Sequence, residues 1–170
     1  MTAYTACHAQ DVWVQLTTDE IRYAVQVGRQ MRQTSVTNGH AEKITVGEGM
    51  GERIQLLGAV AELAVAKALN IPWRDQDGRY KQADLLDDIE VKLIGVNHYG
   101  LRVYDTIPDH YRVVGVVIPR GKERDPYRIP GWIQAGDAKR DRWLMRPFGI
   151  GLSFYAVPQS QLRPLKELTL

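Results

Sequence analysis

The stretch ADLLDDIEVKLI, residues 83–94, decides how this chain can fold. Its second half alternates apolar and polar side chains with a period of two, which predicts a half-buried strand. One face carries Val91 and its apolar neighbours, and the other carries Glu90 and Lys92 side by side. Residues on the same face of a strand lie roughly 6.6–6.8 Å apart, so one ligand can bridge this carboxylate and this ammonium. The residues before the strand predict an earlier strand and a turn, and therefore a hairpin.

An almost wholly apolar segment, IQLLGAVAELAVAKAL at residues 54–69, precedes the hairpin. A helix that is apolar all round is a buried helix, and Gly58 and the alanines around it would let this one lie close against a sheet. Its one carboxylate is Glu62. Because an ionised carboxylate buried without a partner costs several kcal/mol, Glu62 needs a cation, a metal or a proton.

The order of a helix carboxylate, an Asp and a Glu-x-Lys strand resembles that of the PD-(D/E)XK phosphodiesterases, the restriction-endonuclease-like nucleases. The likeness covers roughly residues 50–120 and is nearest in character to small phage and Holliday-junction-resolvase-like members. It implies an α/β fold, with a mixed central β-sheet flanked by helices. It also implies a metal-dependent DNA endonuclease that hydrolyses phosphodiester bonds. The catalytic residues that it implies are Glu62, Asp84, Glu90 and Lys92.

The resemblance assigns Glu62, Asp84 and Glu90 to Mg²⁺, for which Mn²⁺ would be a substitute. Lys92 would position or deprotonate the attacking water and offset charge on the phosphate. These roles are chemically sufficient, because carboxylates that hold one or two Mg²⁺ ions can activate water and stabilise both the phosphate and the leaving alkoxide. Hard oxygen ligands suit Mg²⁺, and the sequence has no Cys/His cluster of the kind that binds zinc.

The register of the hairpin decides whether Asp84 shares a face with Glu90. A two-residue loop at Asp87 and Asp88 would turn Asp84 away, whereas a three-residue loop at residues 87–89 would put it on the charged face. A β-bulge would also reconcile the two. The family commonly has a longer spacing and a Pro before its Asp, which this chain lacks. Asp87 and Asp88 are therefore alternatives for the metal-binding Asp.

The composition indicates one globular domain over residues 1–170, because 44% hydrophobic and 25% charged residues are ordinary values for a chain that buries a core. The single cysteine, Cys7, excludes an intramolecular disulfide and fits a reducing, cytoplasmic interior. Neither an apolar run of about 18 residues nor a signal-like start is present, so we expect no transmembrane helix, no signal peptide and no membrane partner.

The remaining patterns predict elements on either side of the motif. The run TTDE at residues 17–20 predicts a helix start, with a threonine hydroxyl as the cap and acids in the first turn, and this helix is expected to fade near Ser35. Residues 1–16 show no clear element. Further predictions are a short strand at 101–104, a central strand at 112–118, a turn and short helix within 129–141, and a strand at 154–157.

Basic side chains flanking the motif are expected to include the phosphate contacts of a DNA partner. They are Arg29, Arg32, Arg102, Arg120, Lys122, Lys139 and Arg140. A homodimer is compatible with the sequence. The competing interpretations are a non-catalytic nucleic-acid-binding or structural protein on the same fold, and an unrelated α/β protein in which Glu62 is simply paired in the core. Divalent-metal binding separates the first of these from a nuclease.

Overall fold

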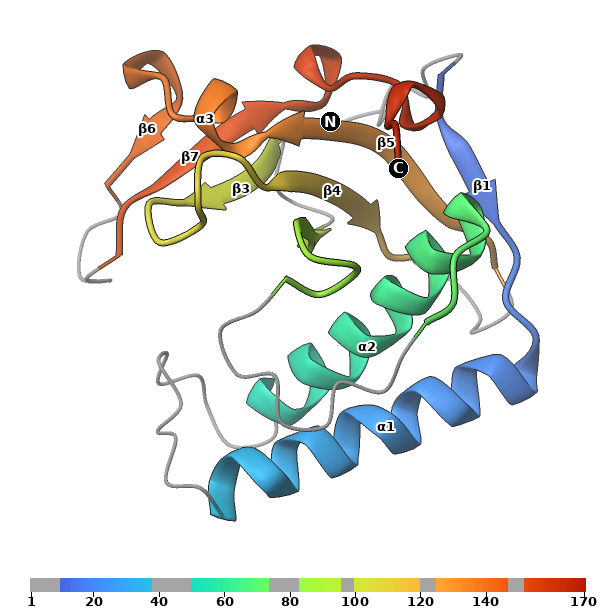
Figure 1. The fold of residues 1–170 in the computed structure, drawn as a ribbon. Coiled ribbons are helices and arrows are strands. Elements are labelled where there is room, and N and C mark those ends of the chain that lie inside the picture. Colours follow the sequence, from blue (N-terminus) through green and yellow to red (C-terminus); the bar gives the residue numbers. More distant parts are fainter. Residues whose placement is uncertain (1–9, 38–49, 74–82, 96–99, 120–124, 147–151) are drawn as a thin grey trace, which may run out of the picture.

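The chain forms a mixed α/β protein of two long helices and two sheets (Figure 1). The computed structural model describes residues 10–37, 50–73, 83–95, 100–119, 125–146 and 152–170. The helices are α1 (Thr18–Thr37) and α2 (Met50–Leu69). The larger sheet has the order β1 (Val12–Val14), β5 (Tyr127–Gln134), β4 (Arg112–Val117), β2 (Ile89–Ile94). The smaller sheet has the order β3 (Gly100–Tyr104), β7 (Phe154–Pro158), β6 (Leu144–Met145).

Helix α1 begins where the sequence predicts it. The Glu20 backbone N–H donates to the Thr17 hydroxyl at 3.1 Å, and the Thr17 backbone N–H donates to the Glu20 carboxylate at 2.7 Å. This reciprocal pair is a capping box, which satisfies donors that a helix N-terminus otherwise leaves without partners. The helix continues two residues past the expected end at Ser35. No helix in the described part of the chain is long and apolar enough to cross a membrane.

Helix α2 packs between α1 and the larger sheet. Its small residues Ala59, Ala61 and Ala64 are buried, as the apolar sequence predicts. The close approach of the two helices depends on Gly28 of α1, where an added Cβ would lie 3.2 Å from the Ala59 Cβ. Gly58 has a different role from the one expected, because an added Cβ there would meet nothing within 4 Å. Gly58 therefore faces open space rather than the sheet.

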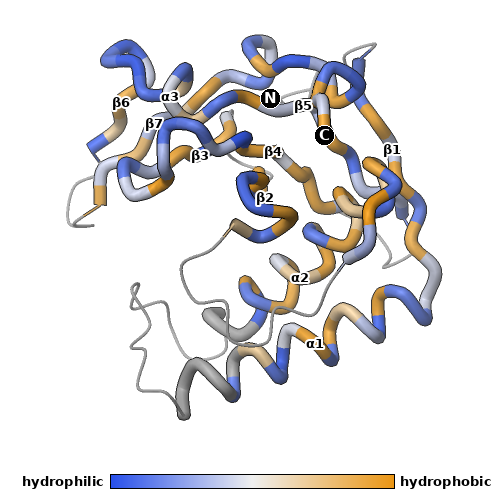
Figure 2. Tube along the Cα trace, in the orientation of Figure 1, coloured by the Kyte–Doolittle hydropathy of each residue, from blue (hydrophilic) through white to orange (hydrophobic). Residues whose placement is uncertain are grey.

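The two faces of the larger sheet belong to separate apolar clusters. Val91 and Val114 face the cluster that includes the alanines of α2, whereas Val113, Ile94 and Ile133 face the cluster shared with the smaller sheet. Figure 2 shows apolar residues along α2 and β4, where these elements face each other. The expectation of a sheet flanked by helices is thus right for one face only, since β3 and β7 cover the other.

Strand β4 is central, as predicted, and pairs in parallel with β2 and antiparallel with β5. The predicted turn and helix within 129–141 are wrong for the first part of that range, because β5 continues to Gln134 and only α3 (Ala135–Ala138) is helical there. Pro130 is tolerated in the strand because a register irregularity lies opposite it, between Gly115 and Val117.

Tertiary pairing also explains the neighbouring glycine. Gly131 has a φ of +143°, and an added Cβ would lie 2.2 Å from the Arg163 carbonyl oxygen. The C-terminal segment reaches β5 at this point, where Trp132 and Arg163 exchange backbone hydrogen bonds of 3.0 and 2.8 Å. The short strands β1 and β6 also had no signal in the sequence, because their few residues gain order by pairing with β5 and β7.

Candidate functional site

The site is built on β2, which is an edge strand of the larger sheet. The segment before it is not a full strand: Leu85 and Ile89 form an isolated antiparallel bridge around a turn at residues 86–88. This register matches neither of the two that the sequence suggested. Leu86 adopts a φ of +51°, which lets a three-residue turn close one position earlier than expected. Asp84 is carried toward Glu90 as a result.

The Asp84 side chain binds the open edge of β2. Its Oδ2 accepts a hydrogen bond of 2.7 Å from the Val91 backbone N–H. An edge strand presents backbone groups without a strand partner, and the carboxylate satisfies one of them. Two other acids were alternatives for this position. Asp88 instead forms an ion pair with Arg112, and Asp87 is exposed, which leaves Asp84 as the acid of the site.

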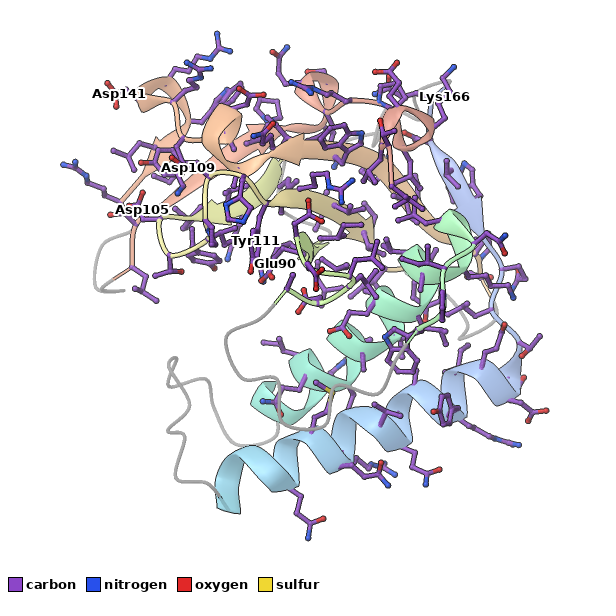
Figure 3. All side chains as sticks on the ribbon, in the orientation of Figure 1. Glu90, Asp105, Asp109, Tyr111, Asp141 and Lys166 are labelled. Carbon is purple, nitrogen blue, oxygen red and sulfur yellow. The ribbon has the colours of Figure 1, made fainter. Side chains whose placement is uncertain are left out.

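Glu90 and Lys92 lie side by side on β2, as their spacing predicts. The Lys92 Nζ donates to the Glu90 Oε1 at 2.5 Å. The exposed fractions of the two side chains are 28% for Lys92 and 16% for Glu90, so water screens this pair only in part. Figure 3 labels Glu90 at the start of β2, which lies between β4 and α2 in this view.

Glu62 reaches the same neighbourhood from α2. Its side chain is half-buried, and the Trp73 indole N–H donates to its Oε2 at 3.4 Å. Tyr23 of α1 holds the Trp73 ring in an edge-to-face contact with ring centroids 5.8 Å apart. Within the described ranges no cationic side chain forms an ion pair with Glu62. The need for a cation, metal or proton that the sequence indicated therefore persists in the folded chain.

The pKa values of Glu62, Asp84 and Lys92 are all shifted, because these groups are buried and close to one another. Burial, followed by repulsion from Asp84, raises the pKa of Glu62 to about 8. Burial and repulsion from Glu90 raise the pKa of Asp84 to about 6. Burial alone would lower the pKa of Lys92, but attraction to Glu90 and Asp84 outweighs it and raises that pKa. Three carboxylates thus share one ammonium in a partly desolvated place, where like charges disfavour ionisation.

A cavity of about 580 Å³ opens beside these residues, and Glu62, Asp84 and Lys92 line it. Strand β3 contributes to the lining as well, through Arg102 and Tyr104. Gly58 belongs to the lining as well, which explains the open space at its Cα.

The β3 wall of the cavity is held against β7. The Arg102 guanidinium lies 4.7 Å from the centroid of the Phe154 ring, and Tyr104 contacts the same ring with centroids 6.0 Å apart. Tyr104 and Trp73 were not among the residues predicted from the sequence. The signal for Tyr104 was its spacing of two from Arg102, which puts both on one face of a strand. Trp73 follows the end of α2 and carried no comparable signal.

The donor set suits a hard divalent cation, because it consists of carboxylates with too little positive charge around them. Among the described residues, however, no three His, Cys, Asp or Glu side chains form a ready-made metal site. Glu90 accepts a hydrogen bond from the Lys92 ammonium, and Asp84 accepts one from the Val91 N–H. An ion would have to draw these side chains away from their present partners.

The basic residues predicted to contact DNA fall into different settings. Arg102 lines the cavity, and Arg29 is exposed on α1. Arg140 is an exposed side chain paired with Asp137 at 3.6 Å. The remaining predictions at Arg120 and Lys122, and the side chain of Arg32, lie outside the described residues.

Lys139 has a structural role that the sequence did not indicate. Its Nζ donates to the Asp109 carboxylate at 2.6 Å, to the Ile107 carbonyl at 2.7 Å and to the Asp105 carbonyl at 3.2 Å. These partners belong to the connection between β3 and β4. The side chain is only 17% exposed, and these contacts hold the connection in place. The role of Lys139 as a DNA contact stays a prediction.

Comparisons of the chain with protein-family models, curated proteins and solved structures found no match. The function is therefore inferred from the residues of the site and their geometry.

Proposed function

We propose that this protein is a metal-dependent DNA endonuclease that hydrolyses phosphodiester bonds, with a site like that of the PD-(D/E)XK nucleases. One observation carries the proposal: Glu62, Asp84 and Glu90 gather around a single ammonium, that of Lys92, beside a cavity at a sheet edge. A structural ion-pair network would balance its charges. This set has a surplus of buried negative charge, and such surpluses are typical of sites that bind a cation or move a proton.

Glu62, Asp84 and Glu90 are the residues that would hold Mg²⁺, or Mn²⁺ in its place. The bound ion would supply two positive charges that stabilise the phosphate oxygens and lower the pKa of the attacking water. Burial and repulsion between neighbouring carboxylates raise the pKa of Glu62 and of Asp84, and a bound cation would oppose both effects. Ion binding should therefore displace a proton from Glu62 at neutral pH.

Lys92 is suited to orient the attacking water and to offset charge on the phosphate. Of the two roles that the resemblance allows, deprotonation of water is disfavoured. The neighbouring carboxylates raise the pKa of Lys92, so the side chain remains an ammonium at neutral pH and has no free lone pair to accept a proton. A fixed ammonium can stabilise charge that develops in the transition state without reorganising.

Arg102 is the DNA contact best placed for this site. It lines the same cavity as Glu62 and Lys92. Its contact with Phe154 limits the conformations of the guanidinium, which suits a bidentate phosphate contact. A phosphate bound in this cavity would have both the Lys92 ammonium and the Arg102 guanidinium among its lining groups.

The proposal is tested by a cleavage panel of linear duplex, nicked, single-stranded and four-way DNA in Mg²⁺, Mn²⁺ or EDTA. We expect cleavage that depends on the divalent ion and is lost in Asp84→Asn and Glu90→Gln. The matched control is Asp87→Asn, which removes an exposed carboxylate from the same turn and should cut at the wild-type rate. If the wild type binds DNA in Ca²⁺ but cuts none of these substrates, the non-catalytic nucleic-acid-binding alternative is right.

Calorimetry gives an independent test that needs no substrate. Titration of Mg²⁺ at pH 7 in two buffers with different ionisation enthalpies reports protons released on binding. We expect the wild type to release part of a proton and Glu62→Gln to release less, because the amide carries none to lose. An absence of Mg²⁺ and Mn²⁺ binding in the wild type would remove the metal from the proposal.

A further inference from the structure

A second cavity, of about 530 Å³, shares no lining residue with the acidic site. We call it the arginine pocket, because three arginines line it with one acid and one tryptophan: Arg140, Arg142, Arg163, Asp137 and Trp143. It lies where the 3-10 turn η1 (Asp141–Trp143) meets β5 and the C-terminal segment. Figure 3 shows Asp141 of that turn well apart from Glu90, and Figure 2 shows a hydrophilic chain around it.

Contacts within the chain hold the guanidinium groups in place. Arg163 donates to the Asp137 carboxylate at 2.7 Å and lies 5.0 Å from the Trp132 ring. Arg142 lies 4.4 Å from the centroid of the Trp143 ring. Guanidinium groups that are already positioned lose less conformational freedom when a ligand binds.

The charges of the pocket do not cancel. Asp137 is its one acidic lining residue, and this carboxylate pairs with both Arg163, at 2.7 Å, and Arg140, at 3.6 Å. Arg142 has its cation–π contact with Trp143 and takes no part in these pairs. The pocket therefore has a surplus of positive charge. Planar guanidinium groups match the oxygens of a phosphate in pairs, so the ligand class that fits is a phosphate.

We propose that the arginine pocket binds a phosphate group. The group can come from the backbone of a polynucleotide or from a small phosphorylated molecule. A polynucleotide would gain from a contact here, because the carboxylates of the acidic site repel phosphate when no cation is bound. The Trp143 ring adds an aromatic face on which a base can stack. The pocket does not depend on cleavage at the acidic site.

The test compares Arg142→Gln and Arg163→Gln with Arg22→Gln. Arg22 is the charge-matched control, since its side chain is 77% exposed on α1 and pairs only locally with Asp19 at 3.5 Å. Arg163→Gln also removes the interactions with Asp137 and Trp132, so circular dichroism must first show a native fold, and Arg142→Gln serves if it does not. All binding is measured in EDTA, which excludes metal binding and cleavage.

Two kinds of ligand distinguish the two sources of phosphate. Inorganic phosphate and a mononucleotide are titrated by calorimetry, and labelled single-stranded and duplex oligonucleotides by fluorescence anisotropy over a range of salt. We expect each pocket variant to weaken binding about fivefold or more relative to Arg22→Gln. On duplex DNA, the slope of log affinity against log salt should become shallower by about 0.9 for each phosphate that the variant no longer neutralises.

The pattern across the ligands identifies the source. Weaker oligonucleotide binding identifies a polynucleotide backbone, and weaker binding of phosphate or the mononucleotide alone identifies a small molecule. If both variants bind every ligand as Arg22→Gln does, the arginine pocket is not a phosphate site. A wild type that cuts no DNA would defeat the endonuclease proposal and leave this result unaffected.

Discussion

Both edges of the larger sheet carry buried charged side chains, but the charges are paired at one edge and unbalanced at the other. Beside β1, Arg128 and Asp11 form an ion pair of 2.9 Å with side chains 6% and 1% exposed, and Gln159 accepts a further hydrogen bond of 2.8 Å from Arg128. Beside β2, Glu62, Asp84 and Glu90 share the single ammonium of Lys92.

The difference separates a structural charge pair from a candidate site. At the β1 edge the guanidinium and the carboxylate lie against each other, and their attraction offsets part of the cost of removing both from water. At the β2 edge three acids lie near the one ammonium of Lys92, and burial together with repulsion between the acids raises the pKa of Glu62 and of Asp84. Burial alone therefore does not mark function. The proposed function rests instead on an imbalance of buried charge beside a cavity, which is present at the β2 edge. Substitutions at the two edges test this contrast.

The largest expected effect on stability lies at the β1 edge. Arg128→Ala leaves the Asp11 carboxylate buried without its guanidinium partner, which typically costs about 3–5 kcal/mol. Arg22→Ala removes an exposed partner of Asp19 and should cost less than about 1 kcal/mol. Urea unfolding of both variants measures the contrast. Equal midpoints would show that the Arg128–Asp11 pair does not stabilise the sheet edge.

The second effect is on rate at the β2 edge. Lys92→Ala should lower single-turnover cleavage in Mg²⁺ by about 10²–10³, because one preorganised charge is lost from the transition state. DNA binding in Ca²⁺ should change little. The matched control is Lys67→Ala on α2, whose ammonium pairs with Glu20 at 2.8 Å away from the cavity. A Lys92→Ala variant that cuts at the wild-type rate would leave Lys92 as a salt-bridge partner only.

Stability of the Lys92→Ala variant is best compared near pH 5. The substitution leaves no apolar cavity, because Val91 supplies the buried face of the strand. At neutral pH, however, it also removes the ammonium that offsets the charges of Asp84 and Glu90, since Glu62 with a pKa of about 8 is already largely protonated there. At pH 5 much of the repulsion between Asp84 and Glu90 is relieved, because Asp84 with a pKa of about 6 is then largely protonated as well. A loss of cleavage with near-native stability at pH 5 would locate the defect in the chemistry.

The third effect is a pH dependence of stability without metal. The pKa of Glu62 is 4.5 in its ordinary state and about 8 in the folded chain, so the folded state binds the proton more tightly. Stability should be highest below about pH 4.5 for this group and should fall as pH rises through 8. Each pKa unit corresponds to about 1.4 kcal/mol, and for a half-buried group we expect roughly 2 kcal/mol in all.

Glu62→Gln tests this assignment. The variant should be more stable than the wild type at pH 8 and should lose less stability between pH 5 and pH 8, as measured by thermal or urea unfolding in EDTA. Asp84 contributes a dependence of the same sign through its own raised pKa, so some slope should remain. Identical pH profiles for the wild type and Glu62→Gln would mean that folding does not raise the pKa of Glu62.

The smallest effect distinguishes a structural lysine from a DNA contact. Lys139→Ala should cost about 1 kcal/mol of stability, because its partner Asp109 is 76% exposed, and should leave the salt dependence of DNA affinity unchanged. Arg102→Gln should instead make the slope of log affinity against log salt shallower by about 0.9 on duplex DNA. If Lys139→Ala makes the slope shallower and Arg102→Gln does not, then Lys139 contacts DNA and Arg102 does not.

Local patterns of the sequence were enough to predict the elements of the site. The capped helix α1, the buried helix α2, the strand β2 with Glu90 beside Lys92, and the central strand β4 all follow from periodicity and capping. These signals are local, because a helix or strand buries one face at a period that the chain itself records. The lone acid in an apolar helix also indicated that Glu62 would need a positive partner or a proton.

Contacts distant in sequence decided the rest. The sequence allowed more than one register for the turn before β2. In the structure Leu86 has a positive φ, and Asp84 accepts a hydrogen bond from the edge of the strand. β5 runs through Pro130 because a β4 irregularity and the C-terminal segment accommodate it. Lys139 became structural because three acceptors converge on it from the β3–β4 connection.

The sequence by itself thus determined which residues are candidates for the site, and the tertiary structure decided what each of them touches. The physical reason is that side-chain periodicity depends on neighbours along the chain, whereas partners and burial depend on elements brought together from far apart. The arginine pocket illustrates this, since its guanidinium groups come from residues 140–163 and converge only when the C-terminal segment packs against β5.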